Sequence, residues 1–68
     1  MPNYYVNTQP QSTGEHEVHE SGCSHPPDVQ NRKSLGYHSD CKSAVKEAKQ
    51  HYTKVDGCFY CCKDCHSR

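Results

Sequence analysis

Cysteine and histidine residues far apart in the chain have the spacing of metal ligands. His19 and Cys23 form a His-x-x-x-Cys pair, and Cys58 and Cys61 form a Cys-x-x-Cys pair. Two such side chains three or four residues apart can share one metal ion without strain, and Zn²⁺ takes four Cys or His ligands in a tetrahedron. We therefore expect a structural zinc site built from these four residues.

The last cysteines overlap and leave a second ligand set open. Cys62 and Cys65 form another Cys-x-x-Cys pair, and His66 follows Cys65 directly. One tetrahedral site cannot use all of these side chains. Because successive side chains of an extended or turning chain usually point to opposite sides, Cys62 should point away from Cys61, with Cys65 on the same outer side. We prefer Cys58 and Cys61 as ligands and keep Cys62, Cys65 and His66 as alternates.

The composition predicts a domain that needs such a staple. Only 31% of the 68 residues are hydrophobic, and the chain has no Trp and a single Phe. Chains this short bury little surface and often depend on a metal, disulfides or a partner. A structural zinc ion contributes about 10–16 kcal/mol of apparent binding free energy, enough to decide whether the chain folds.

The elements that position the ligands follow from the hydrophobic pattern. Residues 3–7 are rich in β-forming side chains, and residues 15–19 alternate, with His16 and Val18 on one face. A polar turn containing Pro and Gly separates them, so a β-hairpin is expected. Residues 34–37 are expected to form a third strand, with Leu35 and Tyr37 on the core side.

One helix is expected before the Cys-x-x-Cys pair. Ser39 and Asp40 are good N-cap residues. Gly57 suits the left-handed position that ends a helix, so the helix should lead directly into Cys58. The helix is predicted from one apolar stripe with helical spacing, which consists of Cys41, Ala44, Val45, Ala48, Tyr52 and Val55.

Together these elements predict one small α+β domain over residues 1–68. Its sheet would be three-stranded and antiparallel, with one helix packed on it and a C-terminal Cys knuckle stapled by the metal. Residues 1–14 would form the first strand and a flexible turn. Residues 24–33 include two adjacent prolines and are expected to be a loop.

The order of these motifs resembles the small Ada-type metal-binding domain over residues 16–61. The resemblance rests on His19-x-x-x-Cys23, Leu35-Gly36-Tyr37, Ser39-Asp40-Cys41-x-x-Ala44 and Gly57-Cys58-x-x-Cys61. It implies metal ligands at His19, Cys23, Cys58 and Cys61. The DNA-repair branch of that family has a methyl-accepting Cys where this chain has His19, so methyl transfer is not expected. The Gly-Cys-x-x-Cys-x-x-x-Cys-His pattern is also similar to small uncharacterised bacterial proteins.

The charge balance and the absence of targeting patterns limit which partners and which compartment are expected. Lys and Arg together number 8, as do Asp and Glu, so the net charge is zero and nucleic-acid binding should be weak or absent. The sequence shows no signal-peptide pattern and no apolar run long enough to span a membrane. We therefore expect a cytoplasmic protein without membrane contact, in which cysteines serve as metal ligands or redox groups rather than disulfides.

These observations favour a non-enzymatic zinc module that acts as an interaction domain. The expected state is a monomer that binds a protein partner of unknown identity, because no catalytic motif is visible. The first alternative is a disulfide-stapled scaffold in an oxidising compartment, with Cys41 paired to Cys62 or Cys65. The second is a CxxC redox protein, in which Cys58-Phe59-Tyr60-Cys61 superficially resembles the glutaredoxin motif. Such cysteines need a helix N-terminus, whereas Cys58 is expected to follow a helix.

Overall fold

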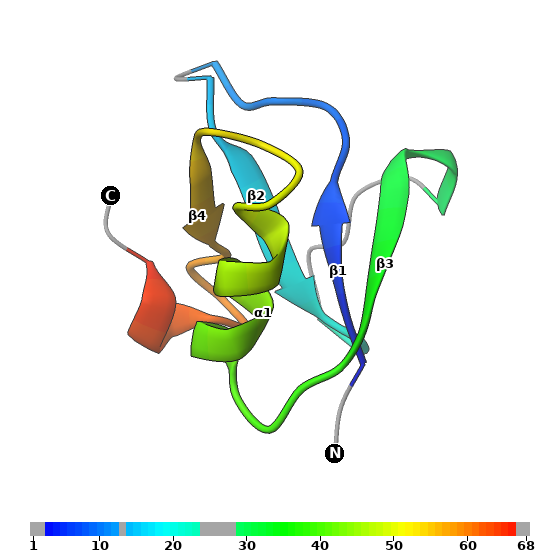
Figure 1. Cartoon of the computed structure of the whole chain (residues 1–68), viewed down its shortest axis with the longest axis vertical. Helices are drawn as coiled ribbons and strands as arrows, with labels where there is room; N and C mark the ends of the chain where they lie inside the picture. Colours follow the sequence, from blue (N-terminus) through cyan, green and yellow to red (C-terminus); the bar gives the residue numbers. More distant parts are fainter. Residues whose placement is uncertain (1–2, 13, 24–28, 67–68) are drawn as a thin grey trace.

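Within the part of the chain that the structure describes, the backbone forms a four-stranded sheet, with strand order β3-β1-β2-β4, and one α-helix (Figure 1). β1 (Asn3–Asn7) lies between β2 (His16–Glu20) and β3 (Arg32–Tyr37) and is antiparallel to both. β4 (Val55–Gly57) runs parallel to β2 on the other edge of that strand. This computed structural model describes residues 3–12, 14–23 and 29–66.

The α+β class, the hairpin and the single helix agree with the sequence prediction, but the predicted sheet was incomplete. The three expected strands pair in antiparallel fashion, and β4 makes the sheet mixed. The backbone N–H of His16 donates to the Lys54 carbonyl at 2.9 Å, just before the two strands come into register. A prediction from local periodicity does not detect this parallel pairing, because it joins segments far apart in the chain.

The helix, α1 (Cys41–Ala48), begins where expected and ends early. The Asp40 carboxylate caps it by accepting a hydrogen bond from the Ser43 N–H at 3.1 Å. The prediction that the helix runs to Val55 was wrong. The Tyr52 ring stacks on His16 with ring centroids 3.8 Å apart, and Val55 begins β4. Sheet contacts therefore override the helical spacing of the last two apolar residues.

β3 is longer than predicted and carries an irregularity that reorients one side chain. Its pairing with β1 shifts register between Tyr4 and Tyr5, and Gly36 adopts a φ of +80°. Leu35 is buried as expected, but Tyr37 is 70% exposed. The expectation that both face the core was wrong, because the bulge and the left-handed glycine break the alternation of side chains.

The segment before β3 is more ordered than the predicted loop. Residues Val29–Asn31 form a short 3-10 helix, η1, and β3 already starts at Arg32. The remainder of the predicted loop, residues 24–28, lies outside the described residues. No helix among the described residues is long and apolar enough to span a membrane.

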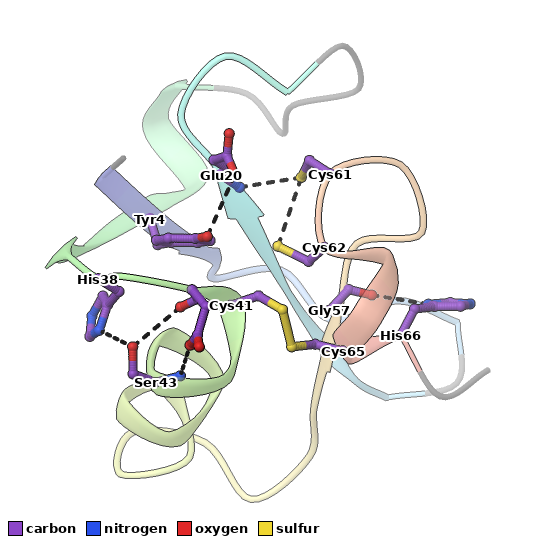
Figure 2. The surroundings of a disulfide bond; sticks show 11 residues. Tyr4, Glu20, His38, Cys41, Ser43, Gly57, Cys61, Cys62, Cys65 and His66 are labelled. Atoms are coloured by element: carbon purple, nitrogen blue, oxygen red, sulfur yellow. Dashed lines mark hydrogen bonds between the residues drawn. A yellow bond between two sulfur atoms is a disulfide. The ribbon is translucent and has the colours of Figure 1, made fainter. Parts of the chain in front are cut away.

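α1 packs on one face of the sheet, and the resulting core is small and rich in cysteine. A second 3-10 helix, η2 (Lys63–Cys65), lies beside α1 and is joined to it by a disulfide between Cys41 and Cys65 (Figures 1 and 2). The thin core supports the expectation that this chain needs covalent or metal staples. Its buried members are Tyr4, Val6, Val18, Leu35, Cys41, Ala44, Ala48, Cys58 and Cys62.

Candidate metal centre

The four preferred ligand residues come together at the ends of β2 and β4. The donor atoms of His19, Cys23, Cys58 and Cys61 all lie within 4.8 Å of one another. The Cys23 and Cys58 sulfurs are 3.7 Å apart, and the Cys61 sulfur is 3.9 Å from His19 Nδ1. A tetrahedral Zn²⁺ with Zn–S distances of about 2.3 Å places its sulfurs roughly 3.8 Å from each other. The cluster could therefore hold a metal ion with little movement of its side chains.

β2 and the turn after it place the first two candidate ligands, His19 and Cys23. Val18 faces the helix, and because side chains alternate along a strand, His19 faces the opposite side. Both are buried, with exposures of 0% and 2%. The Cys23 N–H then donates to the Glu20 carbonyl at 3.0 Å, which closes a turn in which Gly22 has a φ of +91°. This turn directs Cys23 back towards the end of β2.

β4 and the following turn place the other two. The Cys58 N–H donates to the Val18 carbonyl at 2.9 Å and fixes Cys58 beside β2. The Cys62 N–H donates to the Cys58 carbonyl at 2.8 Å and closes the turn that contains Cys61. The Cys-x-x-Cys knuckle is therefore anchored on the same strand that carries His19.

Gly57 permits this turn through close packing rather than through its backbone angle. A Cβ atom at this position would lie 2.8 Å from Cys65 Cβ and 2.9 Å from the Cys62 carbonyl oxygen. Gly57 is buried in β4, so its predicted role as a left-handed helix end was wrong. A glycine is required here because the segment after Cys58 folds back directly over it.

Backbone N–H groups point at the cysteine sulfurs. The backbone N–H groups of Cys61 and Tyr60 favour the thiolate form of Cys58 and partly offset the effect of burial on its pKa. The Glu20 N–H donates to the Cys61 sulfur at 3.2 Å (Figure 2). Such bonds stabilise the negative charge of a metal-bound thiolate.

Glu17 orients the imidazole of His19. Its carboxylate lies 3.1 Å from His19 Nε2, which leaves Nδ1 facing the sulfur of Cys61. Tyr5 stacks against the other side of the ring, with centroids 5.7 Å apart. A carboxylate on the distal nitrogen is the usual support of a metal-binding histidine, since it fixes both the tautomer and the ring orientation.

Burial sets the protonation of the metal-free cluster. It lowers the pKa of His19 to about 4, with a further contribution from the charge of Arg32, so the imidazole is neutral at pH 7. Burial raises the pKa of the thiols of Cys58 and Cys61. A divalent cation would reverse this effect, because its charge deprotonates a coordinating thiol.

The three alternate ligands lie outside the four-residue cluster, although the Cys62 sulfur is 4.0 Å from the Cys61 sulfur (Figure 2). Cys62 is 2% exposed and belongs to the core, so its predicted outward orientation was wrong. Cys65 is bonded to Cys41. His66 Nδ1 lies 3.0 Å from the Gly57 carbonyl and 3.2 Å from an oxygen of buried Asp56, so this nitrogen already has two polar neighbours.

Sequence reasoning missed the groups that contact the candidate ligands. Glu17 and His19 are two residues apart on one strand, so the alternation of β2 places both side chains on one face and could have identified Glu17. No comparable signal indicates the N–H of Glu20, because its bond to Cys61 depends on how the knuckle docks.

Comparison of the chain with protein-family models, curated proteins and solved structures gave no match. The resemblance to the Ada-type domain therefore stays a prediction.

Proposed function

We propose that this protein is a non-enzymatic module whose fold is stapled by one structural Zn²⁺ ion. The ligands are His19 Nδ1 and the sulfurs of Cys23, Cys58 and Cys61. The observation that carries the proposal is the convergence of these four donor atoms, from the ends of two strands and two turns, within 4.8 Å. Three thiolates and one imidazole in a tetrahedral arrangement are a donor set that suits zinc.

A structural role follows from the closed ligand set. Four protein ligands complete the tetrahedron and leave no position for a water or a substrate. His19 and Cys58 are 2% and 1% exposed, so solvent has little access to them. Catalytic zinc sites instead keep one coordination position open.

The environment of the Cys-x-x-Cys pair argues against a redox enzyme. Cys58 follows β4 and not a helix N-terminus. Burial raises the pKa of both Cys58 and Cys61, whereas a reactive redox cysteine needs a lowered pKa. The pair therefore suits a metal better than it suits disulfide exchange.

The disulfide does not compete with the metal for ligands. It joins Cys41 to Cys65 and uses none of the four cluster residues. The two staples that the sequence presented as alternatives are thus compatible in one chain. In the cytoplasmic location that we propose, this disulfide would be exposed to cellular reductants.

The module's role would be to present a surface to a protein partner. Phe59 and Tyr60, in the turn between two ligands, are 51% and 63% exposed. This chain has a single Phe and yet places it at the surface, where it contributes little to the core. Exposed aromatic side chains are enriched at protein interfaces. We propose a monomer with weak or no affinity for nucleic acid, given the net charge of zero.

Metal removal tests this proposal. The purified chain should contain one zinc per molecule by elemental analysis. Chelation under reducing conditions should collapse its amide resonances into a narrow range, and stoichiometric zinc should restore their dispersion. A metal-free, reduced chain that keeps dispersed resonances would show that zinc is not the staple.

A further inference from the structure

We propose that the Cys41–Cys65 disulfide is a redox latch on the metal centre. When it is closed, it holds the segment that carries Cys58 and Cys61 in its binding geometry; when it is reduced, the metal is held less tightly. This inference rests on the proposed zinc site and adds regulation to it.

Cys65 is connected to the ligand segment by direct contacts. Its backbone N–H donates to the Cys62 carbonyl at 2.9 Å, and the Cys62 N–H donates to the Cys58 carbonyl at 2.8 Å. Cys65 also packs over Gly57, where its Cβ would lie 2.8 Å from an added Cβ. Gly57 immediately precedes the ligand Cys58. Because Cys65 packs on Gly57 and Gly57 adjoins Cys58, a displacement of Cys65 would shift the backbone at the metal centre.

The other end of the disulfide is anchored in the rigid part of the fold. Cys41 is the first residue of α1 and is 9% exposed within the core. The Asp40 cap fixes this end of the helix, and Ala44 and Ala48 bury the helix against the sheet. The bond thus ties the last part of the described chain to α1 (Figure 2).

The disulfide is also the cysteine pair that redox chemistry can reach while the metal is bound. A cleft of about 330 Å³ is lined by Cys41, by Cys62 and by the proposed ligand Cys61. Cys65 lies outside this lining and is half-buried, so it is the more exposed end of the disulfide. In the loaded protein, three thiolates are masked by the metal, and Cys62 is 2% exposed. Reactivity of a cysteine follows its exposure and its thiolate character.

The redox step is a two-electron thiol–disulfide exchange. A dithiol reductant attacks the Cys41–Cys65 bond through a mixed disulfide, and its second thiol then completes the exchange. The S–S bond of the protein breaks, Cys41 and Cys65 each end as a thiol, and the reductant becomes a disulfide. The two electrons and two protons all come from the reductant. The reverse exchange closes the latch again.

The expected effect is a loss of metal affinity of at least about tenfold on reduction. The bond closes a loop across a sequence separation of 24, so its loss gives the unfolded chain more freedom. A smaller folded fraction raises the apparent dissociation constant of the metal in proportion.

Zinc affinity should be measured by competition with a chromophoric chelator, with and without a trialkylphosphine. The phosphine takes oxygen from water and delivers two electrons to the disulfide, so its products are the phosphine oxide and two thiols. Tryptic mapping verifies the redox state, since the oxidised chain yields residues 34–42 linked to residues 64–68. The matched variant carries Cys41→Ser and Cys65→Ser, which leaves all four proposed ligands intact.

The latch predicts that the phosphine weakens zinc binding to the wild-type chain by tenfold or more. The double variant should bind zinc as weakly as the reduced wild type, with and without the phosphine. Equal zinc affinity of the oxidised and reduced wild type overturns the latch alone. Equal weakening of wild type and variant also overturns it, because the reductant then acts elsewhere. Absence of zinc in both redox states overturns the proposed function itself. If the double variant does not fold, the comparison of the oxidised with the reduced wild-type chain decides.

Discussion

Replacement of Glu17 by alanine tests whether the proposed site depends on an oriented histidine. The Glu17 carboxylate lies 3.1 Å from His19 Nε2 and is the contact that directs Nδ1 towards the sulfurs. Its side chain is 21% exposed, and burial raises the pKa of its carboxyl group. Removal of this partner leaves a buried Nε2–H without its acceptor and frees the ring to rotate.

The expected loss follows from two contributions. Removal of a supporting partner of a metal ligand typically lowers metal affinity by about 10- to 100-fold, or roughly 1.4–2.7 kcal/mol. The stacking of Tyr5 on His19 limits how far the ring can turn, so we expect a value nearer tenfold. The loss of one negative charge near a cation adds to this effect.

Glu20→Ala is the matched control for that charge. Glu20 is in the same strand, and its side chain approaches the Tyr4 hydroxyl at 3.5 Å instead of a ligand. The hydrogen bond from its backbone N–H to the Cys61 sulfur does not depend on the side chain and remains in the variant. The difference between the two variants therefore isolates the contact with His19.

Zinc competition at pH 7.5, with both variants and the wild type in the same redox state, provides the assay. We expect Glu17→Ala to bind zinc about tenfold more weakly than Glu20→Ala. Equal affinities of the two variants would refute the role of Glu17 in orienting His19, and so would a Glu17→Ala chain that binds like the wild type.

Three further predictions concern packing, protons and nucleic acid. Gly57→Ala should lower the free energy of unfolding by about 1–3 kcal/mol in urea titrations, because its Cβ would meet Cys65 Cβ at 2.8 Å; an unchanged midpoint would contradict that contact. Zinc binding at pH 7 should release about three protons, one per cysteine, because each coordinating thiol loses its proton. The imidazole of His19 is largely neutral at this pH in the folded chain, where burial lowers its pKa to about 4, and in the unfolded chain, where an ordinary His pKa is about 6.5. Affinity should thus rise with pH, and calorimetry in two buffers gives the count; a release of one proton or fewer would exclude three thiolate ligands. Mixed-sequence DNA at about 0.15 M salt should bind with a Kd weaker than ~10⁻⁵ M, and nanomolar binding would reverse our interpretation of the net charge.

The sequence predicted which His and Cys side chains come together better than it predicted the elements that carry them. One strand and one glycine turn position His19 and Cys23. One short turn positions Cys58 and Cys61. Because each pair depends on a short segment, its spacing in the sequence was enough to predict it. The structure then brings the two pairs together. The helix start at Asp40 could also be predicted from local sequence, because an Asp directly before an apolar stripe with helical spacing is a favoured N-cap residue.

The errors arose where distant segments meet. The spacing of Tyr52 and Val55 fits a helix, yet one stacks on His16 and the other pairs with β2. Gly57 has a close-packing role that depends on Cys65, which no local pattern records. Non-local contacts of this kind override propensity, and a single sequence carries little information about them.

X-ray absorption at the zinc edge of the loaded, full-length chain tests the central claim most directly. The account predicts one nitrogen at about 2.0–2.1 Å and three sulfurs at about 2.3 Å from the metal. A shell of four sulfurs would contradict it, because Cys62 or Cys65 would then replace His19. A shell with oxygen or nitrogen in place of two sulfurs would contradict the three-cysteine site as well.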